Sequence, residues 1–138
     1  MYILDKDYLQ IEIKDNKLIY YSELDIIPTE TQFKEVEEVL LNYISAIDKK
    51  KIKFYQIFNV DNASISSIYN FSTVILWICN FFQTQHDIFE KYLRCTVIII
   101  DNSFIKNSIN LVLKAYEHAR PIYFIVDIDE LDDLLKLH

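Results

Sequence analysis

Alternation of apolar and polar residues opens the chain. Residues 8–14 alternate at period two, in the order Tyr-Leu-Gln-Ile-Glu-Ile-Lys, and an extended pattern resumes at residues 17–22. Asp15 and Asn16 lie between the two runs, and both residue types are frequent in tight two-residue turns. The pattern therefore predicts a β-hairpin of two antiparallel strands.

A helix is predicted after the hairpin. Thr29, with Gln32 three residues later, has the spacing of a capping box. Apolar residues then recur at helical spacing, namely Phe33, Val36, Leu40, Tyr43 and Ile47. The lysines at 49–51 follow, where the helix dipole favours cations. We therefore predict a helix over residues 30–48 and interpret the lysines as its end, not as a basic binding patch.

Runs of β-branched and aromatic residues predict three further strands, at residues 53–58, 96–100 and 122–126. The run at 96–100 is the most apolar, so we expect it at the centre of a sheet. Helical spacing predicts a very apolar helix over residues 68–84 and another that Ser103 caps and Arg120-Pro121 ends. Asp129 is expected to cap a short C-terminal helix.

The order of these elements is ββαβαβαβα. Strands joined by single helices through short connections run parallel, with right-handed crossovers. Residues 1–138 are therefore predicted to form a single α/β domain, a mixed β-sheet of about five strands that carries helices. In this sheet only the strand at 8–14 is expected to run antiparallel to most others.

The composition narrows the classes of function. Of 138 residues, 51% are hydrophobic, which is enough for one core. The 14 basic and 21 acidic residues give a net charge of −7, which argues against a nucleic-acid-binding surface. Glycine is absent, so neither a Walker loop nor a GxGxxG motif is present. The composition is typical of a soluble, acidic globular domain.

Patterns for catalysis or metal binding are weak. Cys79 and Cys95 each lie inside an apolar run and are expected to be buried free thiols. The three histidines have no metal-ligand spacing. The acidic residues at 127–133 lack the glycine of a calcium loop. We therefore expect no enzymatic activity, no metal and no cofactor.

The segment at 62–86 bears on membrane insertion, because it contains no Asp, Glu, Lys or Arg. Many Ser, Asn, Thr and Gln residues interrupt it, which is unfavourable for a lipid-facing helix. Its purely apolar stretch, at 74–82, is too short to cross a bilayer. The N-terminus lacks the basic and apolar regions of a signal peptide. The sequence therefore favours a cytoplasmic protein that is not transmembrane.

A serine-rich segment between strand 53–58 and the next helix is the first candidate site. It contains Ser64, Ser66, Ser67 and Tyr69. Ligands and modifications collect at the carboxyl edge of an open α/β sheet, because unsatisfied helix N–H groups point outward there. A phosphoserine at this edge would gain those donors and the positive end of the helix dipole. The alternative is that the serines are ordinary capping and turn residues.

The helix predicted over residues 68–84 has apolar side chains on more than one face. A sheet can cover only one of these faces, so Trp77, Phe81 and Phe82 are candidates for an apolar interface. Three explanations stay open for the second face. A neighbouring helix or loop of the same chain covers it, a homodimer or partner protein does, or it forms the wall of a lipid pocket.

Three stretches of the chain resemble the STAS domain family. Residues 18–36, which include Glu23-Leu-Asp, are similar to the family's strand, Gly-Glu-Leu-Asp turn and helix, with Ser22 where glycine is usual. Residues 58–68 are similar to its next strand and the Asp-Ser-Ser-Gly start of its second helix. Residues 98–103 and 121–131 resemble a subgroup related in shape to SEC14-type lipid-binding domains.

The resemblance implies a fold, a function and a site. It implies a STAS-like fold over the whole chain and a non-enzymatic, regulatory protein-interaction module in signalling. It places the family's phosphorylated serine on Ser67 with Ser66 beside it, although Ser66 replaces the motif's aspartate and its glycine is also lost. The implied partner is a kinase or regulatory protein, or a second copy of the chain. The alternative implied by the SEC14-like subgroup is a lipid- or small-ligand-binding domain.

Overall fold

The hairpin is present in the computed structural model, and one further strand extends it. The structure describes residues 1–21, 27–60, 65–85, 87, 91–101, 103, 106–107, 110 and 121–137. Strands β2 (Gln10–Lys14) and β3 (Lys17–Tyr21) pair antiparallel, and β1 (Tyr2–Asp5) pairs antiparallel with β2. Asp15, in the turn, has a φ of 57°, a left-handed conformation that Asp and Asn adopt more readily than most residues. The hairpin prediction is confirmed, although β2 begins at Gln10 and not at Tyr8.

Helix α1 (Glu30–Lys50) begins at the predicted capping box. The Gln32 backbone N–H donates to the Thr29 hydroxyl oxygen at 3.2 Å, and the Thr29 N–H donates to the Gln32 side-chain oxygen at 2.8 Å. After the last turn, Lys51 has a φ of 55° and its N–H donates to the Ile47 carbonyl at 2.8 Å. The helix therefore ends in a left-handed cap that glycine usually occupies.

The remaining elements follow the predicted order. They are β4 (Phe54–Asn59), α2 (Ile65–Gln83), β5 (Leu93–Ile99), β6 (Ile122–Ile125), the 3₁₀ turn η1 (Ile128–Glu130) and α5 (Leu131–Leu135). Asp129 does not cap the short C-terminal helix: the N-cap position of α5 is Glu130, which makes no side-chain cap hydrogen bond. Asp127 instead caps the preceding turn η1, because its carboxylate accepts the Asp129 N–H at 3.1 Å. Most of the helix predicted after Ser103 lies outside the described residues.

The sheet has six strands in the order β1-β2-β3-β4-β5-β6, and β3 to β6 are parallel neighbours. Among these strands only β2 runs opposite to the others, as predicted. The predicted count of about five strands was too low because it omitted β1. The apolar strand β5 lies one place from the edge and not at the centre, because the strands follow chain order and only β6 comes after it.

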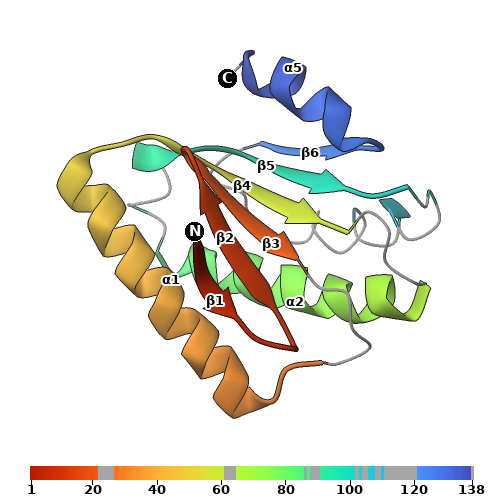
Figure 1. Cartoon of the computed structure of the whole chain (residues 1–138), viewed down its shortest axis with the longest axis horizontal. Helices are drawn as coiled ribbons and strands as arrows, with labels where there is room; N and C mark the ends of the chain where they lie inside the picture. Colours follow the sequence, from red (N-terminus) through yellow and green to blue (C-terminus); the bar gives the residue numbers. More distant parts are fainter. Residues whose placement is uncertain are drawn as a thin grey trace.

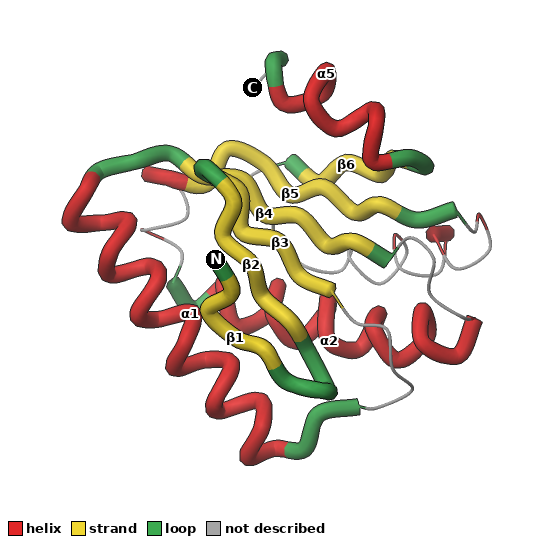
Figure 2. The backbone as a smooth tube through the Cα atoms, viewed as in Figure 1, coloured by secondary structure: helices red, strands yellow, loops and turns green. Residues whose placement is uncertain are grey.

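The helices divide between the two faces of the sheet, as Figures 1 and 2 show. Helices α1 and α2 pack on one face, where the larger core includes Tyr20 stacked on Phe58 with ring centres 4.5 Å apart. Helix α5 packs on the other face, where Leu131 and Leu135 contact a smaller core. Consecutive right-handed crossovers place their helices on the same side of a sheet. The chain is thus a single mixed α/β domain with one heavily covered face.

Candidate functional site

The carboxyl ends of four parallel strands form one edge of the sheet, and α2 starts there. Helix α2 begins at Ile65 and not at residue 68 as predicted, so Ser66 and Ser67 lie in its first turn. Ile65 and Ile68, three residues apart, extend the apolar spacing backward and explain the earlier start. Ser64 and the side chains of Ser66, Ser67 and Tyr69 lie outside the described residues.

The first turn of α2 contains no acidic residue. Backbone N–H groups in a first helical turn have no intrahelical partners and present partial positive charge. On the neighbouring strands, the Val60 N–H donates to the Ile99 carbonyl at 3.0 Å, which extends the pairing of β4 and β5 to this edge. The N–H groups in the first turn of α2 would therefore favour an added negative charge at this edge of the sheet.

The apolar helix α2 buries one side and leaves another partly accessible. Val74, Ile75, Ile78 and Phe82 are buried in the larger core, and Phe82 has only 6% of its surface exposed. Trp77 and Phe81 are half-buried. The buried residues stabilise the fold, so Trp77 and Phe81 are the described candidates for contact with another molecule.

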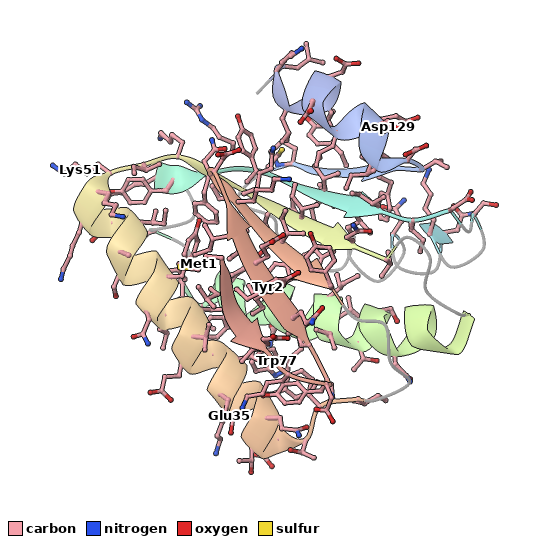
Figure 3. The ribbon with its side chains drawn as sticks, in the orientation of Figure 1. Met1, Tyr2, Glu35, Lys51, Trp77 and Asp129 are labelled. Atoms are coloured by element: carbon pink, nitrogen blue, oxygen red, sulfur yellow. The ribbon has the colours of Figure 1, made fainter. Side chains whose placement is uncertain are left out.

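Helix α1 covers part of the second face of α2. The rings of Phe33 and Trp77 stack with centres 4.3 Å apart and planes 26° apart, and Phe81 lies parallel to Trp77 at 6.0 Å. Figure 3 shows Trp77 beside the N-terminal half of α1. The contact between α1 and α2 at this point is therefore aromatic.

An open pocket of about 360 Å³ lies at this contact, lined by Pro28, Glu30, Phe33, Lys34, Glu37 and Trp77. Of these lining residues, only Trp77 could be named as a candidate from the sequence. A signal was present, because positions 30, 33, 34 and 37 share one face of a helix and combine an aromatic residue with charges. The contact between this face of α1 and Trp77 could not be predicted, because no local pattern indicates it.

A buried polar chain crosses the larger core and was also missed. The Tyr20 hydroxyl donates to the Gln56 side-chain oxygen at 2.8 Å, and the Gln56 amide nitrogen donates to the Thr96 hydroxyl at 3.2 Å. Burial raises the pKa of Tyr20 well above its usual value. These three side chains satisfy one another's hydrogen-bonding groups in the interior, so their role is structural.

Both cysteines are free thiols, as predicted, but only Cys95 is fully buried and Cys79 is half-buried. Burial raises the pKa of the Cys79 thiol to about 12 and that of Cys95 to about 11. The thiolate is the reactive form of cysteine. Both side chains are therefore protonated near neutral pH and unsuited to act as nucleophiles.

Within the described ranges, no three His, Cys, Asp or Glu side chains come together as metal ligands would. No helix in the described part of the chain has the length and apolar character needed to span a bilayer.

Comparison with protein-family models, curated proteins and solved structures finds no match to this chain. The fold defines the class, which is a single-domain α/β protein with a six-stranded mixed sheet. The edge at α2 and the pocket between α1 and α2 are its two candidate sites.

Proposed function

We propose that the protein is a non-enzymatic regulatory module of the STAS type that binds a partner protein at the carboxyl edge of its sheet. One observation carries the proposal. Ser66 and Ser67 lie in the first turn of the helix that follows the parallel strand β4. This is the position at which the STAS resemblance puts a phosphorylated serine.

Phosphorylation is the proposed control. A phosphate on Ser67 would add nearly two negative charges and three acceptor oxygens beside unsatisfied N–H groups. The dipole of α2 would favour that charge by about 0.3–1 kcal/mol. The modification would therefore alter the docking surface without destabilising the fold, as a regulatory switch requires.

Substitutions at Ser67 test the proposal. Ser67→Asp imitates the added charge, Ser67→Ala removes the hydroxyl, and Ser45→Asp makes the same chemical change at an exposed position of α1. Proteins captured from an extract of the native host are quantified by mass spectrometry, and melting temperatures are measured in parallel. We expect Ser67→Asp to change the yield of a specific partner several-fold, while its melting temperature stays within a few degrees of wild type. Ser45→Asp should leave the yield unchanged.

Equal capture by all four proteins would contradict docking at this edge. Phosphopeptide mapping of the protein from its host tests the control separately. Phosphate found only at sites outside residues 64–67 would leave docking intact and remove the proposed switch.

Lipid or small-ligand binding is the alternative, and the aromatic pocket at Trp77 is the feature that favours it. A native mass spectrum of the protein from its host should then show an added mass that solvent extraction removes. Trp77→Ala should lower that occupancy or, for a homodimer, change the sedimentation coefficient. If Trp77→Ala changes only the melting temperature, Trp77 serves the core alone.

A further inference from the structure

The pocket between α1 and α2 has an apolar wall and a charged rim. Pro28, Phe33 and Trp77 form the wall, and Glu30, Lys34 and Glu37 surround it. Pro28 is buried, Phe33, Glu37 and Trp77 are half-buried, and Glu30 and Lys34 are exposed. An occupant of this pocket would contact apolar surface and carboxylate groups at once.

The carboxylates of Glu30 and Glu37 have no partner among the residues that the structure describes. Within the ranges that the structure describes, neither side chain makes an ion pair or a hydrogen bond, including with Lys34 on the same helix face. Burying a charge without a partner is costly. Residues 30–38 contain four glutamates and one lysine, so the local field is negative and attracts cations.

We infer that this pocket receives an arginine or lysine side chain from a protein partner. The aliphatic stem lies on Phe33 and Trp77, and the cationic head reaches Glu37 and Glu30. Such side chains bury their stems on apolar surface while the charged end stays at the rim. Arginine is the better fit, because its planar fork can donate to two carboxylates at once.

Other occupants match the pocket less well. A purely apolar side chain would bury the Glu37 carboxylate further without pairing it, at a cost in free energy. An anionic group would meet two carboxylates and one lysine. The pocket is open to solvent, as a side chain projecting from a partner's surface requires.

The pocket is separate from the proposed docking edge. Trp77 lies eleven positions after Ser66 on the same helix, a distance of about 16 Å at 1.5 Å per residue. The inference therefore stands without the proposed function, and a partner could contact both places.

A random peptide library displayed on phage, selected against the full chain, tests the inference. The same library is selected in parallel against Glu37→Gln and Glu30→Gln, which keep the shape of the side chain and remove its charge. Glu38→Gln is the matched control, because Glu38 is exposed on the same helix and does not line the pocket. Enriched peptides should carry an arginine or lysine next to an apolar residue for wild type and Glu38→Gln.

The affinity of an enriched peptide is then measured by fluorescence of Trp77, the single tryptophan of the chain. Binding should shift the Trp77 emission. Glu37→Gln should raise the dissociation constant of the peptide at least about tenfold, as expected for a lost charge-assisted hydrogen bond. Replacing the peptide's arginine by glutamine should weaken binding to wild type equally and have little further effect on Glu37→Gln.

Three results would overturn the inference. They are no enrichment, enrichment without a basic residue, and peptides whose binding Glu37→Gln and Glu30→Gln leave unchanged. Ser67→Asp serves to separate this inference from the proposed function. If it abolishes capture of the host partner while the peptides still bind, the edge and the pocket are independent sites.

Discussion

On one face of the sheet lie α1 and α2, of 21 and 19 residues, and on the other lies α5, of five residues. Under α1 and α2 the side chains of Tyr20, Phe54 and Phe58 are fully buried. Under α5 the cover depends largely on Leu131 and Leu135. Because buried apolar area is the main stabilising term, we expect the first face to determine global stability and the second to open locally.

The polar contacts also differ between the two faces, because those under α1 and α2 are buried and those of α5 lie near solvent. The covered face holds the buried Tyr20–Gln56–Thr96 chain. Helix α5 is held by an ion pair of 3.7 Å between Lys17 and Asp132 and by a 3.5 Å hydrogen bond from the Tyr55 hydroxyl to the Leu135 carbonyl. Contacts near solvent contribute little, so α5 is the weaker attachment.

Truncation of one buried side chain on each face gives the largest expected difference. Ile78→Ala, in α2, should lower the free energy of unfolding by about 2–5 kcal/mol, as large-to-small core changes do. Leu131→Ala should cost less and should mainly increase amide hydrogen exchange within α5. Urea unfolding and hydrogen exchange measure the two effects. Equal losses with unchanged exchange in α5 would show that α5 belongs to the same cooperative unit.

Removal of one tyrosine hydroxyl from each face should give a smaller difference. Tyr20→Phe leaves the buried Gln56 oxygen without a donor and should cost about 1–3 kcal/mol. Tyr55→Phe removes a bond at the distance limit and should cost less than about 0.5 kcal/mol. Chemical denaturation checks both values. Adding Gln56→Leu to Tyr20→Phe should recover part of the loss, and a further loss of similar size would contradict this account of the buried chain.

The dependence of stability on alkaline pH tests one tyrosine from each face, Tyr8 in the larger core and Tyr21 beside the smaller one. Burial, together with a hydrogen bond to Glu35, raises the pKa of Tyr8 to about 12, and burial with a bond to Glu12 does the same for Tyr21. An unfolded tyrosine has a pKa near 10, so the folded state holds these protons more tightly. Their stabilising contribution is complete below pH 10 and is lost as the pH rises through about 12.

Tyr8→Phe and Tyr21→Phe should each make the fall in stability between pH 10 and 12 less steep. Denaturant midpoints measured at intervals from pH 7 to 12 give the slopes. The slope of each variant below pH 9 should match that of wild type. A variant with the wild-type slope throughout would show that its tyrosine titrates alike in both states.

The smallest expected effect belongs to the ion pair that holds α5. Asp132→Asn should cost less than about 0.5 kcal/mol, because the Asp132 side chain is 80% exposed. High salt should remove the difference from wild type. Asp133→Asn is the control, since among the described residues Asp133 forms an ion pair only with the exposed Lys136, which directly follows α5. A cost above 1 kcal/mol for Asp132→Asn alone would make the ion pair a principal attachment of α5.

Local patterns determined much of the fold. The Thr29–Gln32 capping box needs residues only three positions apart, and the hairpin needs period-two alternation around Asp15 and Asn16. These interactions form within a few residues, so their signals are present in a short stretch of sequence. For the same reason the order of strands and helices, and with it the mixed α/β class, could be predicted.

Long-range partners decided the rest. Strand β1 has only four residues and exists because it pairs with β2, where the Met1 ammonium donates to the Ile13 carbonyl at 3.0 Å. Gln56 can be buried because Tyr20, 36 residues away, satisfies its oxygen. The pocket exists because α1 and α2 meet at one point, where Phe33 stacks on Trp77. The free energy of these contacts depends on which distant groups meet, and no pattern local to either residue specifies that meeting.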